Sequence, residues 1–474
     1  MGSLSNVLAV LSCIFFVVAI KRLGKVRTAR QGNAIAALGM LLAVVAILLK
    51  QTDVNWAWVI AGVVVGSAIG VWAAKTVQMT GMPEMVALFN GSGGIASAMV
   101  AIAYFFLHSE KIGATMGGAD PVWWSHDGTA TLMLSILIGG LTLTGSIVAY
   151  AKLAGRITSA PILLPARHLM NIGLVAAAIA VAILAGWVAP WPWLMTILLF
   201  LLLAIAFVLG VTLVVPIGGA DMPVVISLLN SYSGVAASMT GFVLKEPVLI
   251  IAGALVGAAG LILTQLMCKA MNRSLANVLF GGFGVADSTG TGGGGDYTTV
   301  KEAGPEEAAM ILEDAQSVVF VPGYGLAVAQ AQHACQQLAN MMEERGANVT
   351  HAIHPVAGRM PGHMNVLLAE ADVPYDKLIE MDDINPEFKN TDVAIVLGAN
   401  DVVNPAALTD KSSPIYGMPI LTVHEARTVF VVKRSLSPGF AGIRNELFEN
   451  DNSLMIFGDA KDVLQKLIEE LKNA

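Results

Sequence analysis

The chain has 474 residues, of which 55% are hydrophobic and only 13% are charged. Soluble domains are about 25% charged, so this composition excludes a wholly water-soluble globule. Residues 1–275 carry 14 Lys and Arg against 7 Asp and Glu (net +7), whereas residues 276–474 carry 13 against 27 (net −14). This division predicts a membrane domain followed by an acidic soluble domain. A total charge of −7 argues against nucleic-acid binding, and three scattered cysteines argue against a disulfide framework.

Nine apolar segments in the first part of the chain fit, or nearly fit, the roughly 20 residues that cross a bilayer. They are 4–20, 34–49, 56–74, 83–107, 130–151, 168–188, 191–215, 222–244 and 247–268. Basic residues follow the first segment instead of preceding it, so we interpret it as a retained anchor and not a signal peptide. Alternate loops hold eleven Lys and Arg against three, which predicts an outer N-terminus and an inner soluble domain.

The membrane part contains an internal repeat. Residues 82–99 align with residues 222–239 at a constant offset of 140, with matching Met-Pro pairs and with Asn90 matching Asn230. The two copies are the fourth and eighth spans, so they run in the same direction. This predicts a parallel repeat, which is a common device in transporters.

Polar residues inside the spans are costly in a bilayer and therefore informative. Asp221 opens the eighth span, and Asn230 lies nine residues further, about 13 Å deeper at 1.5 Å per residue. Asn90 is at the matching depth, and Ser146 is on the fifth span. One interpretation is structural, with Asp221 as a helix cap and the other groups as interhelical contacts. The sharper interpretation is a proton path in which Asp221 is the titrating group.

After a Gly-rich linker over 276–304, which we expect to be flexible, the pattern becomes α/β. β-branched runs alternate with helical stretches at about 305–315, 325–345 and 460–472. The runs are 317–321, 348–353, 393–397, 420–423, 429–432 and 454–457. This alternation predicts a Rossmann-like, doubly wound and mostly parallel sheet over 305–474.

The first of these strands ends in a dinucleotide fingerprint. Residues 322–328 read Pro-Gly-Tyr-Gly-Leu-Ala-Val, with Val in place of the third glycine. Gly323 would make the tight turn and Gly325 would let a pyrophosphate approach the main chain. The motif alone is weak, because an ordinary strand-to-helix turn has the same pattern. Its position after a strand and before a helix is the context that the motif requires.

Two other strand ends favour NADP over NAD. The second strand runs into residues 354–362, which contain Arg359 and no acid for a ribose diol. The strand 429–432 leads into Lys433, Arg434 and Ser435, which are suitable partners for a 2′-phosphate. Residues 398–401 at a further strand end would bond ribose hydroxyls or the nicotinamide amide. Neither a metal cluster nor a Ser/His/Asp arrangement is apparent in the sequence.

Over essentially its whole length the chain resembles the β subunit of the proton-translocating NAD(P) transhydrogenase. The resemblance lies in residues 218–223 with 230–234, 322–331, 354–365, 398–401 with 404–406, and 433–435. It implies a partner α subunit of one or two chains that binds NAD(H), a dimer of αβ units, and a bacterial inner membrane with the C-terminal domain cytoplasmic. Hydride would pass directly between NAD(H) on the partner and NADP(H) on this chain, coupled to proton passage, so no catalytic side chain is expected.

The resemblance also implies roles for individual residues. Proton passage falls on Asp221, Asn230, Asn90 and Ser146. Residues 435–442 resemble the family's lid over the cofactor. The implied NADP(H) contacts are Gly323, Tyr324, Gly325, Val356, Ala357, Gly358, Arg359, Met360, Pro361, Gly398, Ala399, Asn400, Asp401, Val402, Gly417, Met418, Lys433, Arg434, Ser435, Leu436, Ser437, Pro438, Gly439, Phe440, Asp459 and Ala460.

The sequence departs from the family at one position. Many members carry a titratable His on the fourth span, where this chain has Asn90. Either Asp221 alone titrates, or a His on a partner helix takes that role. Two other classes of function stay open: a channel or secondary transporter that senses NADP, and a membrane anchor for an NADP-binding module. The potassium-filter sequence is absent, and the matched Asn90 and Asn230 disfavour a simple anchor.

Overall fold

The computed structural model describes residues 2–50, 55–114, 126–188, 191–281, 297–439 and 441–473. The chain forms two compact units. The first comprises residues 1–217 and 224–264, and the second comprises residues 218–223 and 265–474.

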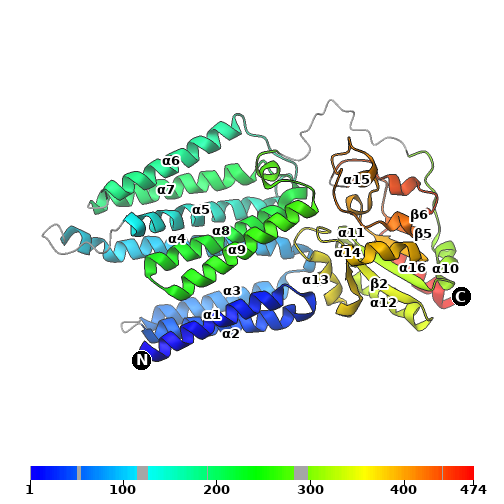
Figure 1. The fold of residues 1–474 in the computed structure, drawn as a ribbon, viewed down its shortest axis with the longest axis horizontal. Helices are drawn as coiled ribbons and strands as arrows, with labels where there is room; N and C mark the ends of the chain where they lie inside the picture. Colours follow the sequence, from blue (N-terminus) through cyan, green and yellow to red (C-terminus); the bar gives the residue numbers. More distant parts are fainter. Residues whose placement is uncertain are drawn as a thin grey trace. The chain divides into compact units, whose positions relative to one another are not determined.

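The first unit is a bundle of membrane-spanning helices (Figure 1). Within the described residues, nine helices are long and apolar enough to cross a membrane. They are α1 (Gly2–Leu23), α2 (Val26–Lys50), α3 (Trp56–Thr76), α4 (Met82–Ala114), α5 (His126–Leu153), α6 (Arg167–Val188), α7 (Pro192–Val214), α8 (Met222–Leu244) and α9 (Pro247–Ala270). Every predicted span is confirmed, with ends that differ by up to eight residues.

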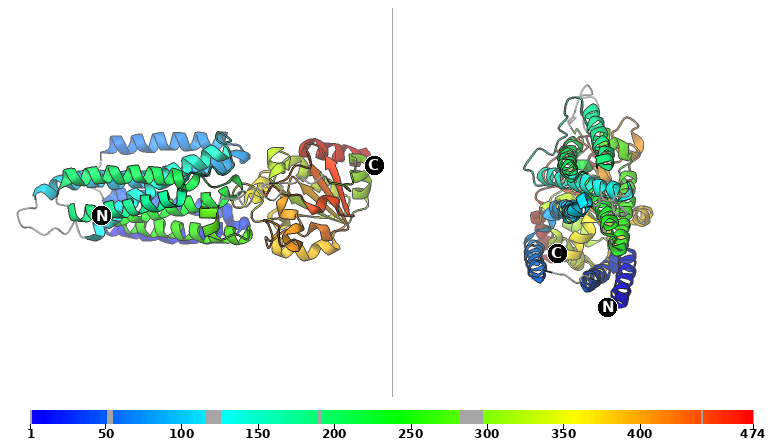
Figure 2. Two further views of the ribbon diagram at one scale, coloured as in Figure 1. Left: turned by 90° about the horizontal axis from the view of Figure 1, so that it is seen from above. Right: turned by 90° about the vertical axis from the view of Figure 1, so that its left-hand side faces the viewer.

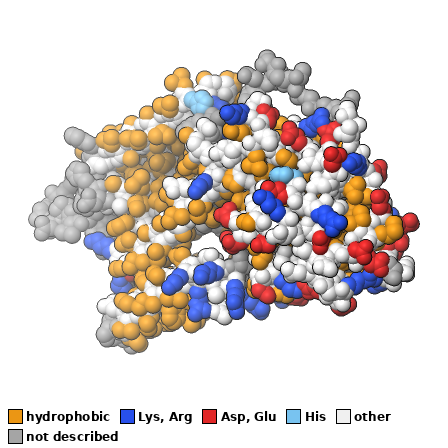
Figure 3. Space-filling model, turned by 45° about the vertical axis from the view of Figure 1, so that its right-hand side comes forward, with side chains coloured by type: hydrophobic (Ala, Val, Ile, Leu, Met, Phe, Trp, Pro, Cys, Tyr) orange, Lys and Arg blue, Asp and Glu red, His pale blue; other side chains and the backbone are white. Residues whose placement is uncertain are grey.

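Large apolar side chains cover these helices (Figure 3). On α3, Trp58 and Trp72 are 78% and 68% exposed. Water would penalise such a surface heavily, whereas lipid would not. The bundle is therefore built to present its outer side to hydrocarbon.

The helices of the bundle pack closely where their residues are small. A Cβ on Gly139 of α5 would lie 2.3 Å from the carbonyl oxygen of Gly94 on α4, so these two backbones touch. Between α8 and α9, the Ser231 hydroxyl donates to the Gly257 carbonyl at 2.6 Å. Small residues that let helices approach, with hydroxyls bonding across, are typical of packing in membranes.

The predicted repeat has the same local structure in both copies. A 3₁₀ turn at Met79–Gly81 leads into α4 at Met82, and a 3₁₀ turn at Gly219–Asp221 leads into α8 at Met222. The amide of Asn90 donates to the Ile226 carbonyl at 3.2 Å. The two repeated helices are thus bonded to each other.

The second unit contains one parallel sheet flanked by helices (Figure 1 and Figure 2). The strands are β1 (Ser317–Pro322), β2 (Asn348–Ile353), β3 (Leu378–Glu380), β4 (Val393–Leu397), β5 (Thr428–Lys433) and β6 (Ser453–Phe457). Their order is β3-β2-β1-β4-β5-β6, which is the Rossmann order. The helices are α10 (Pro305–Glu313), α11 (Tyr324–Val328), α12 (Gln332–Glu344), α13 (His363–Glu370), α14 (Met381–Ile384), α15 (Ala406–Thr409) and α16 (Ala460–Asn473). The predicted α/β fold is confirmed.

Two details of the prediction for this unit are wrong. The apolar run 420–423 is not a strand: it is buried against the sheet, and Leu421 donates its N–H to the Val402 carbonyl outside any ladder. The sixth strand is instead β3, which pairs with β2 through His351 and Leu378. The predicted helix 325–345 is interrupted, because Gln330 has a φ of +50° between α11 and α12.

The end of the predicted linker packs on the sheet. The Ala303 N–H donates to the Met455 carbonyl at 2.9 Å, and Met455 donates to Lys301 at 2.8 Å. Residues 301–303 therefore run beside β6. The Gly-rich part of the predicted linker, 282–296, lies outside the described residues.

Candidate functional site

Two adjoining cavities lie at the carboxyl edge of the sheet, where β1, β4 and β5 end. Their volumes are about 220 and 460 Å³. Small-molecule sites have volumes of roughly 300–1,000 Å³, so the larger cavity alone falls within this range. They share five lining residues: Gly325, Gly398, Lys433, Arg434 and Pro438. The strand order reverses between β1 and β4, and open α/β sheets bind ligands at such a switch point.

Bare main chain forms the floor of these cavities. The Gly323 N–H donates to Leu397 at 2.8 Å and the Gly325 N–H donates to Gly398 at 3.0 Å, so the turns after β1 and β4 are bonded together. A Cβ on Gly325 would lie 2.6 Å from the Cα of Gly398, whose own φ is +66°. Neither position tolerates a side chain. The resulting bare surface fits the close approach of a pyrophosphate that the fingerprint predicts.

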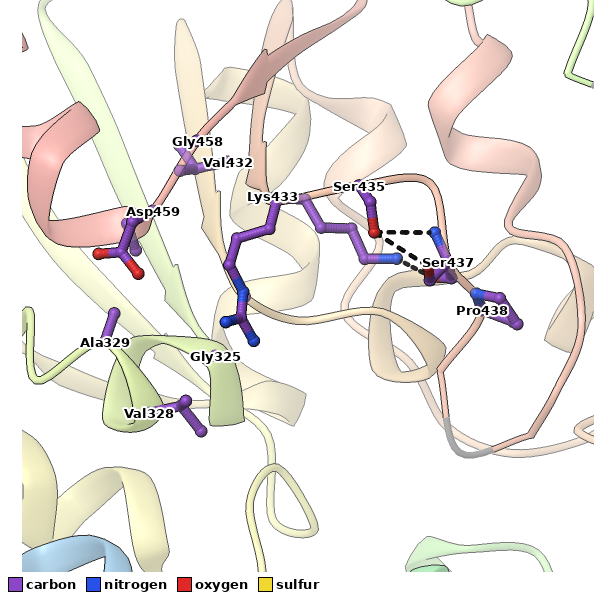
Figure 4. Close-up of a pocket in the computed structure, with 13 residues that line it drawn as sticks. Gly325, Val328, Ala329, Val432, Lys433, Ser435, Ser437, Pro438, Gly458 and Asp459 are labelled. Carbon is purple, nitrogen blue, oxygen red and sulfur yellow. Dashed lines mark hydrogen bonds between the residues drawn. The ribbon is translucent and has the colours of Figure 1, made fainter.

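Positive charge and hydroxyl groups gather at the end of β5. Lys433 Nζ donates to the Ser437 carbonyl and lies 5.1 Å from the Phe448 ring centroid. The Ser435 hydroxyl donates to the Ser437 hydroxyl at 2.9 Å. Burial lowers the pKa of Lys433, while the Asp401 carboxylate opposes that shift. Figure 4 shows Lys433, Ser435 and Ser437 around the smaller cavity, with Asp459 on its opposite side.

Asp401 fixes the segment that crosses the larger cavity. Its carboxylate accepts a hydrogen bond from the Ala441 N–H at 3.0 Å, and a Cβ on Gly439 would lie 2.5 Å from the same carboxylate. Asn445 donates to the Asn400 carbonyl at 3.1 Å. The lid-like segment 435–442 is therefore attached to the turn after β4. Phe440, one of the predicted contacts, lies outside the described residues.

The turn after β2 is held by two histidines. His354 donates from Nε2 to Pro419 at 2.9 Å and accepts at Nδ1 from the Val356 N–H at 3.3 Å, which defines a neutral ring. His363 accepts at Nδ1 from the Arg359 N–H at 3.0 Å. Burial lowers the pKa of each ring to about 4. These bonds keep the turn in place beside the larger cavity.

Tyr324 belongs to the same wall. The guanidinium of Arg359 lies 4.4 Å from its ring centroid, and the His363 ring lies 5.9 Å away edge-on. Arg359 therefore contacts the cavity wall through Tyr324 without lining the cavity itself.

The structure brings most of the predicted cofactor residues together. Those that line the cavities are Gly323, Tyr324, Gly325, Val356, Ala357, Gly358, Gly398, Ala399, Asn400, Asp401, Val402, Lys433, Arg434, Ser435, Ser437, Pro438, Gly439, Asp459 and Ala460. Six others do not line them: Arg359, Met360, Pro361, Gly417, Met418 and Leu436. The sequence reasoning missed Val328, Ala329, Val432 and Gly458. Gly458 follows β6, so its place could be found only from the pairing of β5 with β6.

Asp221 is fully buried at the start of α8. Its Oδ2 lies 3.3 Å from Nη1 of Arg273, three residues after α9. Burial raises the pKa of Asp221 to about 6, and the Arg273 charge opposes that rise. The sequence reasoning used Arg273 only to orient the spans, because nothing in the pattern links positions 221 and 273.

The other predicted polar groups lie within the helical unit. Ser146 is fully buried, and its hydroxyl has no hydrogen-bond partner among the described residues. A Cβ on Gly91, the neighbour of Asn90, would lie 2.9 Å from Ser146 Cβ. Asn90 is buried and Asn230 is half-buried. The structure thus places Asn90 and Ser146 on two helices in direct contact.

Fold and site define a class: a multi-pass membrane protein that carries a Rossmann-type domain with a pocket at its carboxyl edge. The family model described as NAD(P) transhydrogenase beta subunit matches residues 5–470. The chain is 46% identical over 472 residues to the NAD(P) transhydrogenase subunit beta of Rhodospirillum rubrum, and equally to the protein of that name from a strain of this species, with 99% of each chain covered. The chain therefore belongs to the NAD(P) transhydrogenase beta subunit family, which is a proton-translocating enzyme family.

Proposed function

We propose that this chain binds NADP(H) in the two cavities and exchanges hydride with NAD(H) held by an α subunit, in a reaction coupled to proton passage through the helical unit. One observation carries the choice of cofactor. The bare main chain of residues 323–325 and the cations Lys433 and Arg434 at the end of β5 line the same, larger cavity. A dinucleotide with an additional 2′-phosphate would place its pyrophosphate on the bare main chain and its additional phosphate on the cations.

In this proposal the protein positions the cofactor and does no acid–base chemistry. The main chain around Gly323 and Gly325 receives the pyrophosphate. Lys433, Arg434 and Ser435 bond the 2′-phosphate, since a guanidinium and a hydroxyl suit phosphate oxygens. When bound, the nicotinamide ring supplies or accepts the hydride. Asp401 holds the segment 435–442 across the cavity and limits access of water.

Asp221, which directly precedes α8, is the proposed titrating group, and Asn230, Asn90 and Ser146 of the helical unit are the proposed polar track. A charge that crosses 100 mV releases about 2.3 kcal/mol, which corresponds to roughly fiftyfold in an equilibrium constant. Coupling requires the NADP(H) affinity of the Rossmann-type domain to differ between the two protonation states of the track, and the effect is reciprocal.

The proposed organisation follows the same reasoning. Residues 1–275 form the proton-translocating domain, 276–304 the linker, and 305–474 the NADP(H)-binding domain. The partner is an α subunit of one or two chains, and two αβ units form a dimer. The excess of basic residues in alternate loops supports a cytoplasmic C-terminal domain, and the proposed location of the spans is a bacterial inner membrane.

The test uses sealed proteoliposomes that contain the chain with its α partner. NADPH and an NAD analogue are added, and analogue reduction is followed together with internal pH. We expect both signals and a rate that changes with an uncoupler. Hydride transfer without a pH change would refute the coupling, and NADPH binding without any hydride transfer would favour the sensor-transporter class.

The variant Asp221→Asn removes the titrating group and keeps the side-chain shape. We expect it to abolish coupled turnover while NADP(H) binding to the complex persists. Asp376→Asn makes the same change at an exposed site and serves as the control. Full proton pumping by Asp221→Asn would show that another group titrates.

A further inference from the structure

The helical unit buries a lysine that the proposed function does not use. Lys152, in the last turn of α5, is 1% exposed. Its Nζ donates to three main-chain carbonyls: Val215 at 2.7 Å, Ile217 at 2.8 Å and Ala160 at 3.1 Å. An ammonium has three N–H donors, so the main chain uses all of them. Burying a charge is costly unless it is hydrogen-bonded in this way. These three bonds therefore hold the Lys152 ammonium at one defined place.

The three acceptors join separate parts of the chain. Val215 is the C-terminal cap of α7, where the helix dipole places partial negative charge that favours a cation. The Val215 carbonyl also accepts from the Ile162 N–H at 3.3 Å, and Ala160 lies in the same connection between α5 and α6. Lys152 therefore ties the end of α5, this connection and the exit from α7 together.

The exit from α7 leads directly into the turn that contains Asp221. Ile217, whose carbonyl Lys152 bonds, is followed by Gly218, and the Gly218 carbonyl accepts from the Asp221 N–H at 3.1 Å. Gly218 and Gly219 have no side chains that could anchor the turn. The start of the turn is thus defined by the main chain of residues 215–217, which Lys152 holds.

We propose that Lys152 is a positioning residue for proton transfer: by clamping the carbonyls at the exit from α7, it fixes the turn that presents Asp221. The inference rests on the proposed role of Asp221. Lys152 does not carry the proton itself, because each of its N–H groups is committed to a carbonyl. Its loss leaves the carbonyls of Val215 and Ile217 without this cation and frees the turn to move.

The experiment compares Lys152→Met with Lys269→Met in the assembled complex in proteoliposomes. Lys269 is an exposed lysine in the last turn of α9, so its variant makes the same chemical change outside the clamp. We expect Lys152→Met to lower coupled turnover about tenfold or more, as expected when a reacting group is misplaced. Lys269→Met should stay near the wild-type rate. Both variants should still bind NADP(H). Both should also still exchange hydride in a reaction that is not coupled to net proton movement.

The pH profile separates positioning from a merely structural cap. Among the described residues, Asp221 faces Arg273 in its ion pair, and the thiol of Cys268 also interacts with it electrostatically. A displaced Asp221 becomes more hydrated, so the acid limb of coupled turnover should move to lower pH in Lys152→Met. Lys152→Arg keeps the cation and should restore part of this shift. A wild-type rate and profile in Lys152→Met would overturn the inference.

Two further variants keep the test decisive. Lys152→Gln loses the charge but keeps two N–H donors. It replaces Lys152→Met if that protein does not assemble. The acid limb of coupled turnover should again move to lower pH, and a wild-type rate and profile would again overturn the inference. In an Asp221→Asn background, Lys152→Met should cause no additional loss of coupling. If Asp221→Asn itself still pumps, the proposed function fails. If Asp221→Asn abolishes coupled turnover but the Lys152 variants behave as wild type, only the positioning role of Lys152 is refuted.

Discussion

The contact between the turns after β1 and β4 makes the sharpest quantitative prediction. Gly398 has a φ of +66°, and a Cβ there would lie 2.3 Å from Gly325 Cα and 2.7 Å from Gly325 C. In Gly398→Ala, the left-handed backbone costs about 1–2 kcal/mol. The overlap with main chain, which has no rotamer to change, adds about 1–3 kcal/mol. The expected loss of stability is therefore roughly 2–5 kcal/mol.

Gly346→Ala is the matched control for this change. Gly346 also has a positive φ, +96°, but beyond its two chain neighbours nothing would lie within 4 Å of a methyl group added there. It therefore incurs only the backbone cost, about 1–2 kcal/mol. The difference between the two variants isolates the contact. The contact should also affect cofactor affinity, because moving Gly325 disturbs the floor of the cavity. Each 1.4 kcal/mol lost from binding lowers the affinity about tenfold.

Hydrogen exchange of β1 and β4 peptides in the assembled complex measures the stability term, and an NADPH titration of the same samples measures the affinity. Gly398→Ala should lose protection in both strands and bind NADPH about tenfold or more weakly. Gly346→Ala should retain wild-type affinity. Equal destabilisation by the two variants would refute the contact argument, and an unchanged NADPH affinity in Gly398→Ala would separate this floor from the cofactor.

Two further predictions concern charge. Arg434→Gln removes a charge-assisted hydrogen-bond partner worth about 1.5–3 kcal/mol. The NADPH affinity of the complex should therefore fall roughly 10–100-fold, while its weaker affinity for NADH is unchanged. Equal losses of NADPH and NADH affinity in a competition assay would argue against a 2′-phosphate contact. Arg273→Gln removes the cation that opposes the raised pKa of Asp221, about 6 in the wild type, so that pKa rises further. Asp221 then stays protonated to higher pH, and the midpoint of coupled turnover against pH should move upward; a fixed or lowered midpoint contradicts the ion pair.

The sequence predicted the membrane spans and the longer strands well, because each follows a rule that acts locally. Lipid requires a long apolar helix at every crossing, and a buried parallel strand reads as a β-branched run. β3 was missed because three residues carry little pattern, and its identity as a strand depends on pairing with β2. Residues 420–423 have the composition of a buried strand, yet Leu421 bonds Val402 instead of a ladder partner.

The candidate cofactor site was predictable for a related reason. The carboxyl ends of parallel strands meet at one edge, so residues that follow separate strands gather without further information. Gly325, Gly398 and Lys433 lie far apart in the chain and still line one cavity. Gly458 needed the strand order as well, and the bonds of His354 and Asp401 needed the course of the loops.

Cations near the ends of the spans show where reasoning from sequence stops. Lys152, Lys269 and Arg273 all count equally toward the orientation of the helices, because the positive-inside rule weighs only their side of the membrane. The structure separates them by burial and partner: Lys269 is exposed, Lys152 is buried on three carbonyls, and Arg273 pairs with Asp221. A cation that serves orientation alone has no reason to leave water, since burial without compensation is unfavourable. Burial and bonding partners together therefore distinguish the basic residues that do more than orient the chain, and they direct mutagenesis to Lys152 and Arg273.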